Sequence, residues 1–114
     1  MADCIFCKIA SHQIAGRIAY ESPEVVAFHD ANPQAPVHLL IIPRKHVASV
    51  LDLEAGDAGL ALKLLQVAGQ LAQEHGIAER GFRLVANTNA EAGQSVAHLH
   101  LHLLGGRAMD WPPG

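Results

Sequence analysis

Near its C-terminus the chain alternates strictly between histidine and leucine, over residues 98–103. Successive side chains of an extended strand point to opposite faces of a sheet, so this pattern predicts a strand over residues 97–104. One face then carries three histidines, while the leucines of the other face can enter a hydrophobic core. The histidines are His98, His100 and His102.

Apolar residues recur every three or four positions over residues 57–75, which predicts the long helix of the chain. Gly76 follows at the place where glycine commonly ends a helix. Residues 4–12 predict a much shorter helix or turn, because their apolar side chains fall on one helical side.

Four further segments have the composition of strands. Residues 17–21 and 25–30 are separated by a short Ser-Pro-Glu turn, which favours an antiparallel hairpin. Residues 37–43 form an almost continuous apolar run and residues 82–87 a shorter one, whereas residues 31–36 contain two prolines and are expected to be a loop. The predicted fold is α+β: a five-stranded antiparallel sheet with the long helix against one face and a short N-terminal helix.

The chain has 114 residues, of which 50% are hydrophobic, and this composition excludes a disordered chain. We expect a single domain over residues 1–114 with one core. The formal net charge of −3 provides no basic field for a nucleic-acid backbone, so we expect no nucleic-acid partner.

We also expect no membrane association, because no stretch reaches the roughly 20 apolar residues that a spanning helix needs. The start Met1-Ala2-Asp3 is acidic, and Lys8 interrupts the apolar patch after it, so no signal peptide is predicted. These features favour a cytoplasmic protein whose two cysteines are reduced.

The face with three histidines is the main candidate for chemistry. Histidine serves where a side chain must act as a nucleophile, a proton carrier or a metal ligand near neutral pH. A strand with an exposed polar face that happens to be histidine is the less favoured alternative. Gly93-Gln94-Ser95 comes just before this strand, and such a glycine turn can direct backbone N–H groups at an anion. Together these features suggest a phosphate or oxyanion within reach of an imidazole.

Cys4 and Cys7 form a Cys-x-x-Cys pair, which is half of a zinc site or a redox pair. No strand precedes Cys4, which disfavours the redox alternative. The missing ligands could be His38, the polar exception in an apolar run, together with one triad histidine; a hydrogen bond from His38 to another histidine is the alternative. The remaining histidines are assigned no catalytic role: His12, His29, His46 and His75.

Several motifs together resemble the histidine triad family, and within it the Hint branch. The resemblance covers essentially the whole chain. The motifs are His98-Leu-His-Leu-His-Leu-Leu, Cys4-Ile-Phe-Cys-Lys-Ile, Ala27-Phe-His-Asp, Pro33-Gln-Ala-Pro-Val-His, Ile42-Pro-Arg-Lys-His46, Gly93-Gln-Ser-Val and Gly105-Gly-Arg-Ala-Met-Asp-Trp-Pro-Pro-Gly.

The resemblance implies hydrolysis of purine nucleoside 5′-phosphoramidates to AMP or GMP and an amine, with no cofactor required for the chemistry. His100 would be the nucleophile and form a nucleotidyl-histidine intermediate. His102 would bond the phosphate or the departing group, His98 and His38 would orient the central ring, and Ser95 would help the amine depart. The resemblance also implies a homodimer with one continuous sheet, in which the tail with Trp111 reaches the neighbouring site.

The nucleotide would be held by residues from several segments. From the residues alone Asp30 is favoured as a turn residue, but the resemblance makes it the ligand of the ribose hydroxyls. The other implied contacts are Ala31 and Asn87 along the nucleotide, Gly93, Gln94 and Ser95 at the phosphate, and Ile5, Phe6, Ile9, Ile14 and Phe28 around the base. The implied ligands of a structural zinc ion are Cys4, Cys7, His38 and His98.

Two other functions remain open at this point. One is a dinucleoside polyphosphate hydrolase of the same family, with the same nucleophile and a nucleotide as leaving group. The other is a purine-nucleotide-binding dimer without catalysis. A third interpretation makes the histidine strand itself a metal centre.

Overall fold

The computed structural model describes residues 4–114, and the acidic start Met1-Ala2-Asp3 lies outside them. The strands are β1 (Ile18–Glu21), β2 (Val25–His29), β3 (Val37–Pro43), β4 (Phe82–Val85) and β5 (Leu101–Gly105), and the α-helices are α1 (Ile5–Ala10) and α2 (Ala58–Glu74). Short 3-10 turns occupy Val50–Asp52, Ala55–Asp57 and Ala90–Ala92. No helix in this described part of the chain is both long and apolar enough to cross a membrane.

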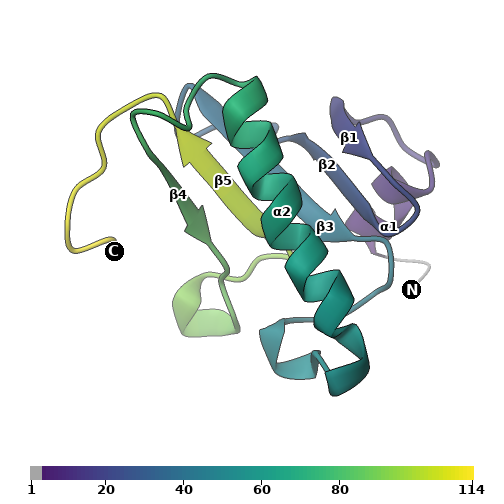
Figure 1. Cartoon of the computed structure of the whole chain (residues 1–114). Coiled ribbons are helices and arrows are strands. Elements are labelled where there is room, and N and C mark those ends of the chain that lie inside the picture. Colours follow the sequence, from purple (N-terminus) through teal and green to yellow (C-terminus); the bar gives the residue numbers. More distant parts are fainter. Residues whose placement is uncertain (1–3) are drawn as a thin grey trace.

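The five strands form one antiparallel sheet in the order β1-β2-β3-β5-β4, and α2 lies across one of its faces (Figure 1). This confirms the predicted α+β fold and the hairpin of β1 and β2. Gly76 has a φ of +72°, a conformation that favours glycine, and it follows the end of α2 as expected.

Each face of the sheet has its own buried cluster, because side chains alternate along the strands. Val25 and Ala27 of β2 pack on the α2 side, whereas Val26 and Phe28 pack with Phe6 of α1 on the other side. The leucines of the alternating segment belong to the α2 side, as predicted: Leu99 and Leu103 are buried there and Leu101 packs against them. The histidines are therefore on the side of α1.

The last strand is shorter than predicted. It begins at Leu101, so His98 and His100 lie in the segment that leads into it. The N–H of Leu99 donates to the carbonyl of Val47 (2.6 Å) instead of pairing with β3, whose ladder with β5 begins at the pair Ile41 and Leu101. The sides are nevertheless kept, because Leu99 is buried in the cluster on the α2 side and His100 packs against Phe6 on the other side.

The end of β5 packs closely against the turn after α2, and this gives a test of the core. A Cβ added at the buried Gly105 would lie 2.6 Å from Ile77 Cδ1 and 2.9 Å from Ile77 Cβ. We expect Gly105→Ala to lower the free energy of unfolding by about 1–3 kcal/mol, the usual effect of overpacking, in urea denaturation. Gly59→Ala, whose Cβ would meet nothing within 4 Å, is the control and should not lower it. Equal stability of the two variants would contradict this packing.

Candidate functional site

A cavity of about 710 Å³ opens on the α1 side of the sheet. One part of its wall is polar, with Asp30, Ser95, His100 and His102. The other part is apolar and includes Ile5, Phe6, Ile9, Phe28 and Leu40. A slot of this size with a few convergent polar groups suits a small ligand that has an apolar ring and a charged end.

His100 has one nitrogen fixed and the other available. Its Nδ1 lies 2.7 Å from the backbone carbonyl oxygen of His98, and since a carbonyl only accepts, Nδ1 carries the proton. In the neutral ring Nε2 then keeps its lone pair. The ring packs edge-on against Phe6, with ring centroids 5.0 Å apart, and only 4% of the residue is exposed. In the neutral form of the ring, the site thus contains a held imidazole nitrogen with a free lone pair.

His102 is held by a different chain of hydrogen bonds. The backbone N–H of Gln34 donates to Nδ1 of His38 (3.0 Å), so the proton of a neutral His38 ring is on Nε2. That Nε2 lies 2.9 Å from Nδ1 of His102 and 3.3 Å from a carboxylate oxygen of Asp30. His102 accepts at Nδ1 and therefore carries its own proton on Nε2. The expectation that His38 orients His100 is corrected: His38 contacts His102 instead.

Burial in the site keeps the rings of His38 and His102 neutral. Burial lowers the pKa of His38 below the ordinary value for histidine, although the carboxylate of Asp30 opposes this. The pKa of His102 is lowered to about 4, first by burial and then by the charges of His100 and His38. Both rings are consequently neutral hydrogen-bonding groups near pH 7.

A second cluster lies beside the cavity, where α1 meets the segment before β5. Cys4 Sγ lies 3.3 Å from Nδ1 of His98, and Cys7 Sγ lies 3.3 Å from Nδ1 of His46. The ligand atoms of these four residues are all within 4.8 Å of one another. Nε2 of His98 donates to the carbonyl of Pro43 (2.7 Å), which leaves the Nδ1 lone pair facing the sulfur atoms. Two thiols and two imidazoles in this arrangement suit a tetrahedral zinc ion.

The structure does not bring the four predicted ligands together: His46, and not His38, lies with the two cysteines and His98. His38 stands at the start of β3 and pairs with Leu104, at the far end of β5 from His98. His46 follows the other end of β3, beyond Pro43, whose carbonyl contacts His98. The roughly 16 Å length of five strand residues separates the two ends, so His38 cannot reach the cysteines.

Asp30, His38 and His102 also bring their ligand atoms within 4.8 Å of one another, but they do not suit a metal ion. A ligand nitrogen needs a free lone pair, and the Gln34 N–H bond at Nδ1 puts the His38 proton on the nitrogen that faces the group. The hydrogen-bond pattern thus opposes the interpretation in which the histidine strand is a metal centre.

Most of the predicted nucleotide contacts meet at the cavity. Those that line it are Ile5, Phe6, Ile9, Phe28, Asp30, Ala31, Ser95, His100 and His102. Those that do not line it in this chain are Ile14, Asn87, Gly93, Gln94 and Trp111.

Two of these last residues have other positions with clear reasons. The amide of Gln94 donates to the carbonyls of Ala48 and Val96, so it holds the loop before the histidines together. Trp111 is 83% exposed, on the C-terminal tail beside the β4 edge of the sheet (Figure 1), where Arg83 donates to the carbonyl of Asp110 (2.9 Å).

Asp30 has the turn role that its sequence position favoured, because its Oδ1 accepts the N–H of Asn32 (2.8 Å). Its second oxygen faces His38 and the cavity, so the turn role does not exclude ligand binding. Sequence reasoning missed other lining residues, among them Arg17, Pro33 and Leu40. Leu40 pairs with His102 across β3 and β5, and only the register of the strands reveals that neighbour.

Comparison with known proteins identifies the family. The model of the HIT domain matches residues 11–109. The chain is 44% identical over 107 residues to the purine nucleoside phosphoramidase of Escherichia coli, covering 94% of this chain and 90% of that protein. It is 48% identical over 112 residues to an uncharacterized HIT-like protein of Synechocystis, covering 98% and 97%. A HIT family hydrolase from Legionella pneumophila has the same fold, with a TM-score of 0.96 at 51% identity over 98% of this chain and 100% of that one. With His100 and His102 at one cavity and a family model that matches most of its length, this chain belongs to the HIT family.

Proposed function

We propose that this protein hydrolyses the P–N bond of purine nucleoside 5′-phosphoramidates and releases AMP or GMP and an amine. The observation that carries the proposal is the fixed tautomer of His100, whose Nδ1–H is bound by the His98 carbonyl at 2.7 Å. The remaining nitrogen, Nε2, is the nucleophile of a ring that lines the cavity. The name of the 44% identical relative from Escherichia coli supports the choice of substrate.

In the first step Nε2 of His100 attacks phosphorus, the P–N bond breaks and a nucleotidyl-histidine forms. The departing nitrogen takes its proton through the hydroxyl of Ser95, which is exposed and can be resupplied by solvent. Water then attacks phosphorus, the bond to Nε2 breaks, and one proton returns to solvent. Both histidines end in the state in which they began, so the cycle balances without a cofactor.

His102 contributes a hydrogen bond and not a full proton. With a pKa of about 4 it is uncharged near pH 7, and its Nε2–H is available to a phosphate oxygen or the departing nitrogen. Such a donor stabilises the negative charge that develops on the phosphoryl oxygens. His38 keeps it in this tautomer through the 2.9 Å contact with Nδ1.

The apolar part of the cavity would receive the purine, between side chains of α1 and Phe28. Asp30 would accept the ribose hydroxyls with the carboxylate oxygen that faces the cavity. A dinucleoside polyphosphate would place its purine and ribose in the same positions. Phosphoramidate hydrolysis and dinucleoside polyphosphate hydrolysis therefore differ in the preferred leaving group, which is an amine in the first and a nucleotide in the second.

Cys4, Cys7, His46 and His98 would hold a zinc ion, whose contribution is structural: it joins α1 to the segment before β5. Thiol ligands require a reducing compartment, which is consistent with a cytoplasmic location.

A homodimer would extend the sheet through β4, which is an edge strand. The side chains that favour this association are exposed and apolar: Leu62 (56% exposed) and Leu65 (54%) on α2, and Phe82 (39%) on β4.

The central test is release of AMP from adenosine 5′-phosphoramidate by the wild type and by His100→Ala. Removing the nucleophile should lower kcat by about 10³-fold or more, while AMP affinity changes by less than about tenfold. His12→Gln, a substitution on the surface away from the cavity, should retain wild-type turnover. Faster cleavage of a dinucleoside polyphosphate would favour that activity instead, and AMP binding without any turnover would favour a binding protein.

The protonation of His102 can be followed by NMR. Its ring should titrate with a midpoint at about 4, whereas an unperturbed histidine titrates at about 6.5. Because the folded pKa lies below the unfolded one, the unfolded chain takes up the proton first, so stability is highest above pH about 6.5 and decreases as the pH falls toward 4. A His102 midpoint near 6.5 would contradict the neutral hydrogen-bond donor.

Metal content distinguishes the two possible zinc ligand sets. His46→Ala should lose most of the bound zinc, since loss of one of four ligands weakens metal affinity by about 100-fold or more. His38→Ala should retain one zinc ion per chain, measured by elemental analysis of the purified proteins. Zinc that is kept by His46→Ala and lost by His38→Ala would restore the ligand set implied by the resemblance.

A further inference from the structure

The turn after β5 touches the loop that leads to His38, although it lies outside the cavity of the site. Arg107 Nε donates to the backbone carbonyl of Gln34 (3.1 Å). The neighbouring Gly106 packs so closely on the same loop that an added Cβ would lie 2.9 Å from Pro36 Cβ. The turn and the loop therefore form one packed unit.

Gln34 connects this unit to the histidines. Its carbonyl receives the Arg107 side chain, and its own N–H donates to Nδ1 of His38 at 3.0 Å. The side-chain amide of Gln34 donates to the backbone carbonyl of Asn32 (3.0 Å). The backbone N–H of Asn32 in turn donates to the Asp30 carboxylate. The position of one loop residue thus determines one of the two contacts that set the His38 tautomer, and the other is the Asp30 carboxylate, 3.3 Å from Nε2.

We propose that Arg107 is a positioning residue for the His38–His102 pair, acting through the backbone of Gln34; this rests on the proposed phosphoramidate hydrolysis. Gln34 lies in a segment without helix or strand, between β2 and β3. A guanidinium makes a strong hydrogen bond to a carbonyl, and Arg107 places one on the outer side of this segment.

The consequence of losing this contact follows from the tautomers. If the Gln34 N–H moves away, only the Asp30 carboxylate still favours the His38 proton on Nε2. The tautomer with the proton on Nδ1 then becomes more populated, and in it Nε2 presents a lone pair to His102. The His102 proton follows to Nδ1, and the nitrogen that faces the cavity no longer donates to the phosphate. The effect should therefore appear in kcat more than in KM, because the nucleotide contacts themselves are unchanged.

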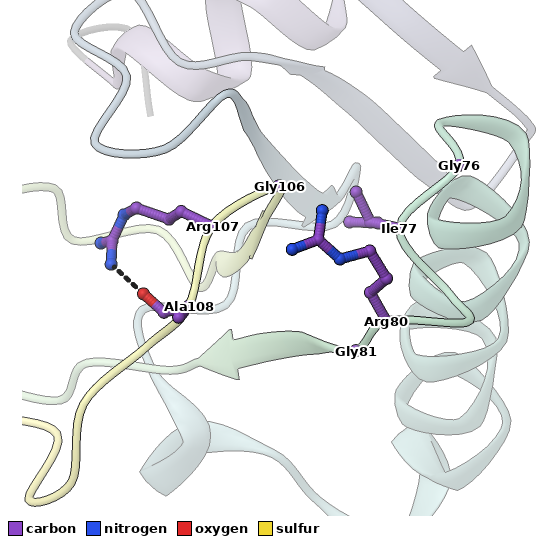
Figure 2. Close-up of a pocket in the computed structure, with 7 residues that line it drawn as sticks. All are labelled: Gly76, Ile77, Arg80, Gly81, Gly106, Arg107 and Ala108. Atoms are coloured by element: carbon purple, nitrogen blue, oxygen red, sulfur yellow. Dashed lines mark hydrogen bonds between the residues drawn. The ribbon is translucent and has the colours of Figure 1, made fainter.

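Arg80 provides a matched control. Arg80 and Arg107 line the same small cavity of about 180 Å³ beside the Gly-Gly turn, and Figure 2 shows that Arg107 extends away from Arg80. Arg107 also donates to the carbonyl of Ala108 (3.1 Å). Among residues 4–114, the Arg80 side chain forms no hydrogen bond or ion pair, so no such bond links it to the Gln34 loop. Replacing either arginine removes the same charge from the same region.

The experiment compares Arg107→Met, Arg107→Lys and Arg80→Met after their molecular masses in solution have been matched to that of the wild type. Arg107→Met should lower kcat for adenosine 5′-phosphoramidate by about tenfold, or about 1.4 kcal/mol, with KM within about twofold. The ¹⁵N resonances of the His38 and His102 rings should move toward an average of the two tautomers. Arg107→Lys should show the same changes at smaller size, and Arg80→Met should show neither.

Wild-type kcat in Arg107→Met, or a lower kcat with unshifted ring nitrogens, would overturn the proposal. If Arg107→Met does not fold, the same two readouts on Arg107→Lys decide it. The nitrogen spectra need no substrate, so they test the link to His38 even if the wild type has no phosphoramidase activity. A shift of the resonances without wild-type turnover would reject the proposed function and keep the structural link.

Discussion

The pairing of β3 with β5 is the constraint on which the rest of this structure depends. Its register sets Leu39 opposite Leu103 and Leu40 opposite His102. Because side chains alternate, a slip by one residue would turn the histidines into the core and the leucines toward the cavity. The buried leucines therefore hold the register, and the register delivers the histidines to the α1 side.

Backbone groups decide which nitrogen of each imidazole carries the proton. The carbonyl of His98 fixes His100, the carbonyl of Pro43 fixes His98, and the N–H of Gln34 fixes His38. Neutral histidine can be either donor or acceptor at a given nitrogen, so a reactive site needs such fixed partners. Burial adds the second requirement, because it lowers the pKa of His38 and His102 and keeps them uncharged.

The short helix α1 links the apolar slot to the cysteine cluster. Six residues are too few for a stable isolated helix, so α1 depends on tertiary contacts. Cys4 accepts the N–H of Cys7 at the start of the helix, and Arg44 donates to the carbonyl of Ala10 at its end. Arg44 also binds the carbonyl of Ser22 and the carboxylate of Glu21, which ties the helix to the first hairpin. Phe6 is thereby held against His100.

Local periodicity was enough to predict several parts of this protein from its residues. The histidine–leucine alternation, the long helix that Gly76 follows and the hairpin around residues 22–24 were predictable, because each pattern spans only neighbouring residues. The motifs also indicated the family. Tertiary structure alone decided which histidine joins the cysteines, where β5 begins and which nitrogens are protonated. These depend on contacts such as His98 with Pro43 and Leu99 with Val47, between residues some 50 positions apart in the chain. No local pattern encodes such contacts, because the packing of the whole sheet creates them.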